Sequence, residues 1–286
     1  RLLPTKDAAG DPSRLAFRAF SACLSSPEFR PQNDVRPTRF LPYPLDAATL
    51  IDADPYKDDL AEPVWHADVM PINAAWLCCE WIEGAEVRRL EGTLPQLSAG
   101  MLRDLHRNLV WALQGLAAIT TAACDKRVPR SSRPKPLHVE DAVLEVLSKL
   151  PRALRRLSFR VSEGLPDDAL WMTSLCPPGA PFQLSRSEIL SLRTSGLGAP
   201  QELMRGTKEA DLARLKAFEK TKPNPQAKAN WVRDACRDWK VAQRARAAER
   251  QEKRAKKCPR LDLIGRFYKS TGNEFERMFE EALAFL

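Results

Sequence analysis

The stretch LSAGMLRDLHRNLVWALQGLAAI, residues 97–119, decides the fold of this chain. On a helical wheel at about 100° per residue, its leucines fall in one stripe. The stripe consists of Leu102, Leu105, Leu109, Leu113 and Leu116. Ser98 is a suitable N-cap, because a serine side chain accepts hydrogen bonds from the free amides of a first turn. The pattern predicts a long amphipathic helix over residues 99–123 whose leucine stripe faces a core.

Trp111 lies on the other side of this wheel, about 180° from the centre of the leucine stripe. Its neighbours there are polar, namely Arg103, Asp104, Arg107 and Asn108. An exposed indole beside guanidinium groups suits a single-stranded nucleic acid, because a base stacks on the indole while arginines hold phosphate. The alternative is that Trp111 packs beneath a neighbouring helix or beneath the N-terminal segment.

Prolines interrupt residues 1–70 so often that only one short helix, at residues 13–24, fits there. We expect this segment to be irregular and to be the tail of a preceding domain. The rest of the chain divides into a helical domain at 71–175, short helices at 176–222, and a basic helix with an amphipathic terminal helix at 223–286.

Helical periodicity also describes the segments around the central helix. It predicts a helix from Ile72 to Trp81 that ends at Gly84, and a helix from about residue 139 that Pro151 breaks or restarts. No alternating strand pattern and no repeat of fixed period is present. The predicted fold class is mainly α.

The net charge of +8 is distributed unevenly. Residues 1–100 contain 10 Lys and Arg against 15 Asp and Glu, whereas residues 205–257 contain 17 against 7. A basic region of this kind attracts a polyanion or an acidic partner, and it also occurs in simple solvated helices. The candidate phosphate contacts in this region are Arg237 and Arg244.

Several kinds of chemistry lack their residues here. The G-x-x-x-x-G-K-[ST] loop that cradles phosphates is missing, and so is a D-E-x-[HD] metal box, so these residues contain no ATPase site. The three histidines have no Ser or Cys partners at recognisable spacing, and the seven cysteines are scattered with no C-x-x-C pair. We therefore predict no catalytic residue, no bound metal and no cofactor within this chain.

The ends and the hydropathy of the chain suggest a fragment of a cytoplasmic protein. No apolar run approaches the ~20 residues of a membrane span, and no signal-peptide pattern is present. The sequence starts at Arg1 without an initiator methionine. We expect further domains upstream.

The order of these motifs resembles the ratchet domain of Ski-like superfamily-two (DEAD/DEAH-box) helicases. The resemblance rests on WIEG at 81–84, on residues 97–119, and on LPRALRRLSFRVSEGLPDDALWMTSL at 150–175. It implies that Trp111 stacks on the translocating strand, that Arg103 and Arg107 bind phosphate, and that ATP and magnesium bind upstream motor domains. Asp104 stands where the family often has an arginine.

The same family places a helix-hairpin-helix after the ratchet domain, which here corresponds to FQLSRSEILSLRTSGLGAPQEL at 182–203. Leu184-Ser185 stands where the hairpin glycine is expected, so the motif is degenerate. Arg186 and Arg193 are its candidate contacts to the nucleic-acid backbone. The resemblance implies a role in gripping single-stranded or forked DNA, or RNA, in DNA repair or anti-phage defence.

Two alternatives remain open for the C-terminal region. The basic helix at 230–257 binds nucleic acid, or it is an exposed spacer whose Trp231 and Trp239 dock on the body of the protein. The terminal helix at 274–286 packs within the chain, or it docks a partner protein as part of a non-enzymatic helical adaptor.

Overall fold

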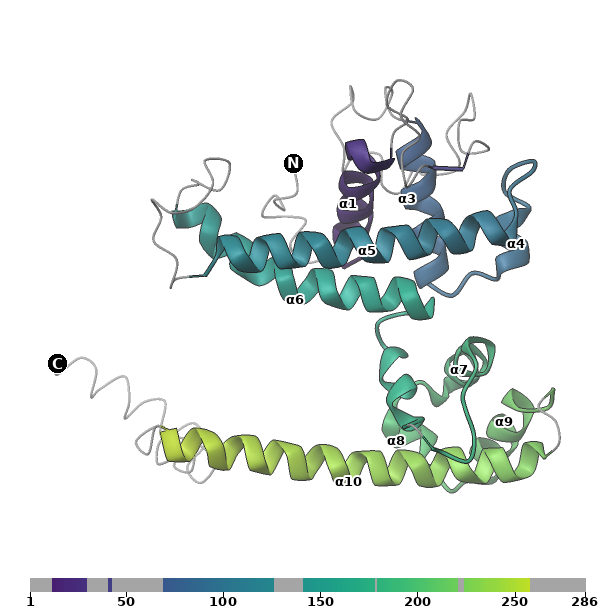
Figure 1. Cartoon of the computed structure of the whole chain (residues 1–286). Helices are drawn as coiled ribbons and strands as arrows, with labels where there is room; N and C mark the ends of the chain where they lie inside the picture. The colour runs from purple at the N-terminus through teal and green to yellow at the C-terminus, as the bar shows by residue number, and fades with distance from the viewer. Residues whose placement is uncertain are drawn as a thin grey trace, which may run out of the picture. The chain divides into compact units, whose positions relative to one another are not determined.

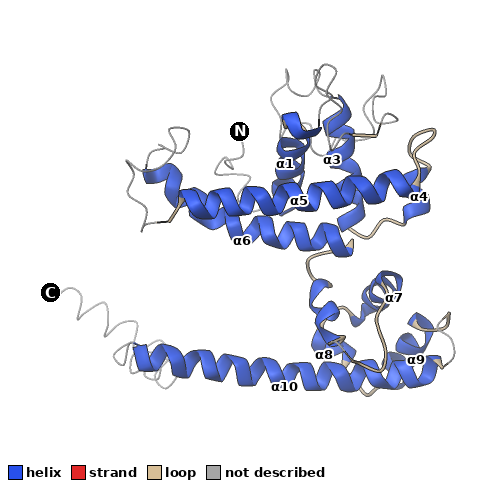
Figure 2. Ribbon diagram, in the orientation of Figure 1, coloured by secondary structure: helices blue, strands red, loops and turns tan. Residues whose placement is uncertain are grey.

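The computed structural model describes residues 12–29, 41–42, 69–125, 141–177, 179–220 and 224–257. Helices make up 76% of these residues, and no β-strand occurs among them (Figure 2). The mainly α fold class predicted from the sequence is therefore confirmed. The amphipathic helix expected at 274–286 lies outside the described residues.

The chain folds as two compact units. They consist of Arg1–Leu170 with Ser185–Leu190, and of Trp171–Leu184 with Ser191–Leu286. The change of unit falls at 170/171, whereas the sequence placed a boundary after residue 175. The sequence also separated residues 176–222 from residues 223–286. In the structure the described parts of both ranges belong to the second unit, except for residues 185–190, which belong to the first.

The first unit is built around a long antiparallel helix pair. Its helices are α1 (Pro12–Leu24), α3 (Val69–Ile82), α4 (Val87–Glu91), α5 (Ala99–Ala123) and α6 (Asp141–Glu163) (Figure 1). Helices α5 and α6 lie side by side, and α1 packs against α3 and α5. Ser98 caps α5 as predicted, because its side chain accepts a hydrogen bond from the Met101 amide. Four of the five stripe leucines are buried, and Leu116 is partly buried.

Helix α1 confirms the short helix expected near residues 13–24, and it also contributes to the core. Phe17, Phe20 and Leu24 are fully buried in one cluster with the leucines of α5. Burying one such side chain stabilises the fold by about 1.5–3 kcal/mol. The described part of residues 1–70 therefore packs within the first unit.

Helix α6 runs through Pro151, where the sequence predicted a break or a restart. A proline inside a helix removes one backbone hydrogen bond and crowds the preceding turn. Leu150, Leu154, Leu157 and Val161 are buried along one side of α6, before and after the proline. We attribute the continuity of the helix to this row, because it holds both halves against the core.

Two glycines in the left-handed region follow the helices of the first unit. Gly84 has φ +105° after α3, and Gly164 has φ +64° after α6. A side chain at position 164 would collide with the Trp81 ring and with the Arg186 guanidinium. Glycine at this position therefore allows Trp81 and Arg186 to approach the end of α6.

The second unit combines short helices with one long helix. Its elements are η7 (Leu170–Leu175), the π-helical turn η8 (Arg193–Leu197), α8 (Pro200–Leu203), α9 (Lys208–Ala217) and α10 (Pro225–Lys257), while α7 (Arg186–Leu192) spans the change of unit. The buried Arg214 of α9 donates hydrogen bonds to the carbonyl oxygens of Leu203 at 2.6 Å and Arg205 at 2.8 Å. These bonds fix the turn between α8 and α9.

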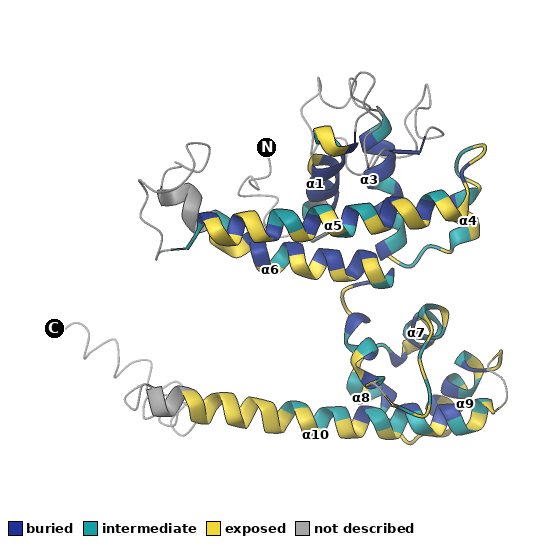
Figure 3. Ribbon diagram, in the orientation of Figure 1, coloured by how far each residue is buried: buried dark blue, intermediate teal, exposed yellow. Residues whose placement is uncertain are grey.

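Helix α10 has a packed part and a solvated part (Figure 3). In the packed part the rings of Trp239 and Trp171 lie 5.1 Å apart, and those of Trp231 and Phe182 lie 5.6 Å apart. Every residue from 244 to 253 is exposed. Both tryptophans therefore pack against other residues of the second unit, as the spacer alternative expected.

The contribution of α1 to the core can be measured with a matched pair of phenylalanine substitutions. Phe20→Ala should lower the free energy of unfolding by about 3–5 kcal/mol, because it leaves a cavity in the core. Phe159→Ala should cost far less, because Phe159 on α6 is 45% exposed. Urea unfolding of both variants measures the difference, and equal losses would show that α1 is not part of the core.

Candidate nucleic-acid interface

Trp111 is exposed, as the helical wheel predicted. Its side chain is 48% exposed on α5, opposite the buried leucines. Arg103 and Arg107 are also exposed on this helix, and Asn108 is half-buried. Arg107 forms an ion pair with Asp104 at 3.3 Å, so part of its charge is neutralised locally. The four predicted site residues of α5 therefore lie together on its outer side.

A groove runs between α5 and α6 beside this surface. It consists of two hollows of about 330 and 440 Å³ that share Val110 and Ser162. Arg103 and Arg107 line the first hollow, and Arg155 and the exposed Phe159 line the second. The groove therefore has apolar and aromatic walls with an arginine in each hollow.

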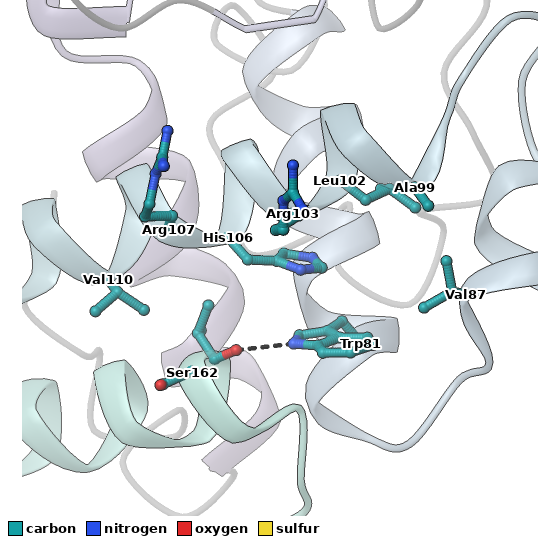
Figure 4. A pocket seen from close by; sticks show the side chains of 10 residues that line it. Trp81, Val87, Ala99, Leu102, Arg103, His106, Arg107, Val110 and Ser162 are labelled. Carbon is teal, nitrogen blue, oxygen red and sulfur yellow. Dashed lines mark hydrogen bonds between the residues drawn. The ribbon is translucent and has the colours of Figure 1, made fainter. Parts of the chain in front are cut away.

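The first hollow is backed by a stack of rings (Figure 4). The imidazole of His106 lies on the indole of Trp81, with ring centroids 4.7 Å apart and an angle of 16° between the planes. The Trp81 Nε1–H donates a hydrogen bond to the Val161 carbonyl oxygen at 2.8 Å, which anchors α3 to α6. Arg186 places its Cζ atom 3.8 Å from the centroid of the Trp81 ring.

Arg186 occupies a structural position, whereas the sequence placed it among the nucleic-acid contacts. Its Nε donates to the Gly164 carbonyl oxygen at 2.6 Å. Its Nη2 donates to the carbonyl oxygens of Trp81 and Ala85, both at 3.0 Å. Burial lowers its pKa to about 10, and the nearby Glu86 acts in the opposite direction. A guanidinium held by three carbonyls and an indole has little capacity left to bind phosphate.

Two features of the sequence point in part to this stack. Trp81 belongs to the WIEG motif, and His106 lies on the same side of α5 as the leucine seam. Neither signal identifies Arg186, because it is 105 positions away from Trp81 in the chain. Only the three-dimensional structure brings these side chains together.

The segment that resembles a helix-hairpin-helix, residues 182–203, has its glycine turn after α7. Ser185 immediately precedes α7, and its carbonyl oxygen accepts the Ile189 amide as a helix start does. The turn toward α8 occurs instead at Gly196, which has φ +78°. Gly198 accepts a hydrogen bond from Trp171 Nε1 at 2.9 Å through its carbonyl oxygen. A turn that demands glycine is therefore present, but not at Leu184-Ser185.

The remaining predicted contacts lie in the second unit. Arg237 and Arg244 of α10 are exposed, and Arg237 forms an ion pair with Asp234 at 3.2 Å. Arg193 begins the π-helical turn and is half-buried. The predicted residues thus form two groups, one on α5 and one in the second unit.

The described cysteines and acids form no metal site. No group of three or more His, Cys, Asp or Glu side chains in the described ranges is placed to hold a metal ion. Cys78 and Cys79 are buried in α3. Burial raises the pKa of the Cys23 thiol to about 12 and that of Cys236 to about 11. Among the described helices, none is long and apolar enough to cross a membrane.

Comparisons with known proteins returned no relative. The sequence matches no protein-family model. No curated protein and no solved structure shows significant similarity to the chain. Evidence for what the chain does must therefore come from its own residues and their geometry.

The stacked histidine makes the stability of the first unit depend on pH. Burial, helped by the charge of Arg186, lowers the pKa of His106 to about 3, against about 6.5 in an unfolded chain. Between these values the unfolded state takes up the proton preferentially. The free energy of unfolding is therefore not reduced by His106 above pH 6.5. Below pH 6.5 it falls by about 1.4 kcal/mol for each pH unit.

His106→Phe keeps a ring on Trp81 and removes this titration. Between pH 6.5 and 5, the wild-type chain should therefore lose about 2 kcal/mol more of its free energy of unfolding than the variant does. Chemical unfolding at the two pH values measures both losses. Identical losses in the two proteins would contradict the burial of a neutral imidazole.

Proposed function

We propose that this chain is the nucleic-acid-gripping, C-terminal part of an ATP-dependent superfamily-two helicase. In this proposal α5 and α6 hold single-stranded DNA or RNA while upstream motor domains bind ATP and magnesium and move the strand. The exposed indole of Trp111 is the observation that carries it. The resemblance of residues 72–215 to the ratchet domain supports the same function.

The stacking surface explains how a strand of any sequence is held. Each base has an aromatic face, and one base stacked on an indole contributes about 1–3 kcal/mol without requiring a particular sequence. Trp111 and Phe159 are both roughly half exposed, on α5 and α6 respectively. Large aromatic side chains are costly to leave in water, so their exposure favours a binding role.

The charge around the groove suits a phosphate backbone. Arg107 pairs with Asp104, and Arg156 pairs with Asp167, so these charges are largely compensated. Three other exposed arginines form no ion pair with any described carboxylate, namely Arg103, Arg152 and Arg155, and Arg155 donates a hydrogen bond to the Thr121 hydroxyl. They leave a net positive surface along α5 and α6, which favours phosphate binding through Coulomb attraction.

The chain supplies binding and positioning in this mechanism, and the motor domains supply the energy. In this mechanism the stacking of a base on Trp111 prevents the strand from sliding back while the motor domains return to their starting position. Because α5 is fixed by its leucine seam, Trp111 moves only when the first unit moves as a body. ATP-driven movement of that unit would carry the stacked base with it.

A docking adaptor is the second candidate function, and it is favoured by a hollow in the second unit. The hollow measures about 490 Å³ and is lined by Trp231, Trp239 and Pro181, among others. The Trp239 Nε1–H is buried and has no hydrogen-bond partner among the described residues. An aromatic wall with an unused donor is typical of surfaces that bind a peptide segment.

Substitution of the stacking residue tests the helicase proposal. Trp111→Ala should weaken binding of a fluorescent single-stranded oligonucleotide about tenfold or more, because it removes one stacked base. Trp111→Phe should retain part of the affinity. Leu212→Ala on α9 is a matched control, because Leu212 is an apolar side chain with 69% exposure. An unchanged affinity for Trp111→Ala would overturn the proposal and favour the adaptor.

Salt dependence separates a nucleic-acid role of α10 from a spacer role. Deleting α10 would unfold the second unit, because Val232 and Cys236 are buried in it. The double variant Arg244→Gln, Arg250→Gln instead removes two exposed charges. If both contact phosphate, the slope of log affinity against log salt concentration should decrease by about 1.4. The same change at Lys208 and Lys216 of α9 is the control, and equal slopes in all proteins would favour the spacer.

A further inference from the structure

His106 lines the first hollow of the groove, and one of its ring nitrogens is buried without a hydrogen-bond partner among the described residues. His106 is only 8% exposed, and its Nε2 has no hydrogen-bond partner among the described residues. Figure 4 shows the imidazole at the centre of the lining residues, with its far edge toward the space bordered by Ala99 and Val87. An unsatisfied buried nitrogen is costly, so a ligand that bonds to it gains more than it would in water.

The chemistry of the walls narrows the class of ligand. Apart from His106, the inner wall is apolar or aromatic, with Trp81, Val87, Leu102 and Val161. The volume of about 330 Å³ lies at the lower end of the range for small-molecule sites, which suits one heteroaromatic ring better than a peptide segment. Arg103 and Arg107 stand at the mouth, and Figure 4 shows their guanidinium groups pointing away from Trp81. The ligand that fits these walls therefore has a flat polar ring, which lies inside the hollow, and an anionic group, which stays outside it.

We propose that this hollow is a base pocket, in which one unpaired base of the bound strand is inserted and hydrogen-bonds to Nε2 of His106. The inference rests on the proposed binding of single-stranded nucleic acid. The base enters between α4, α5 and α6, while its phosphates stay at Arg103 and Arg107. Inserted bases are recognised in this way elsewhere, by hydrogen bonds to their edges and by contact with aromatic side chains.

The stack behind the pocket prepares His106 for such reading. Arg186 is held by three backbone carbonyls and contacts Trp81, and Trp81 in turn contacts the imidazole. The ring is thus supported by side chains that are themselves fixed. A neutral imidazole offers one donor and one acceptor, whereas an imidazolium offers two donors. The pocket therefore distinguishes bases by whether a donor or an acceptor on their edge meets Nε2.

The pocket and Trp111 have different effects on the bound strand. Stacking on Trp111 accepts every base, because it uses only the face of the ring. Hydrogen bonding to His106 depends on the edge of the ring and so discriminates among bases. The groove combines a nonselective grip with one selective position, and the two contributions are separable by substitution.

The test compares oligonucleotides of equal length that contain only thymine, only adenine or only cytosine, or that carry abasic positions. The full chain should bind its best homopolymer about tenfold more tightly than its worst, since one buried hydrogen-bonding position is at stake. His106→Phe should reduce this ratio to near one while leaving the affinity for the abasic oligonucleotide unchanged. A ratio that survives in His106→Phe overturns the base pocket, as does a wild-type chain without base preference.

A second variant covers the case in which His106→Phe does not fold. Ser162 is exposed at the mouth of the pocket, so Ser162→Leu blocks entry without disturbing the core. It should remove the base preference, whereas Ser148→Leu, the same change at another exposed position of α6, should not. A preference retained in Ser162→Leu would overturn the pocket.

The same measurements distinguish the base pocket from the grip on which it rests. If Trp111→Ala weakens binding but no pocket variant alters base preference, only the base pocket fails. If the wild-type chain binds no oligonucleotide, the proposed function fails and the pocket fails with it. Free mononucleotides should compete with the oligonucleotide, because the pocket needs only one base. Competition by inorganic phosphate equal to that by nucleotides would show an anion site and overturn base reading.

Discussion

The burial of one leucine seam on α5 governs the rest of the first unit. Four leucines spaced by three and four residues face α1, α3 and α6, so the rotation of α5 about its own axis is determined by the hydrophobic effect. Once that side is buried, Trp111 must point outward, because it lies half a turn away. The exposure of the indole is therefore a consequence of core packing.

The same rotation places His106 at the edge of the seam, where Trp81 and Arg186 enclose it. The arginine stabilises this corner by donating hydrogen bonds to three backbone carbonyl oxygens, those of Trp81, Ala85 and Gly164. Gly164 makes the arrangement possible, since any side chain there would occupy the space of the indole. A rigid wall beside an open groove results, and such a wall is what selective recognition of a small ring requires.

Charge is distributed over both units, with different degrees of neutralisation. On α5 and α6, some arginines pair with nearby aspartates while others remain available to a ligand. On α10, residues 244–253 are surrounded by solvent, which makes their charges accessible but also strongly screened by salt.

The sequence by itself determined the helical class, the start of α5 at Ser98 and the outward direction of Trp111. These features depend on local periodicity and capping, which act within a few turns of one helix. Tertiary structure alone decided that α1 joins the core, that α6 continues through Pro151, and that Arg186 packs on Trp81. Each of these features depends on contacts between residues that are distant in the chain. The free energy of these contacts exceeds the local tendency of proline to end a helix and of arginine to remain solvated.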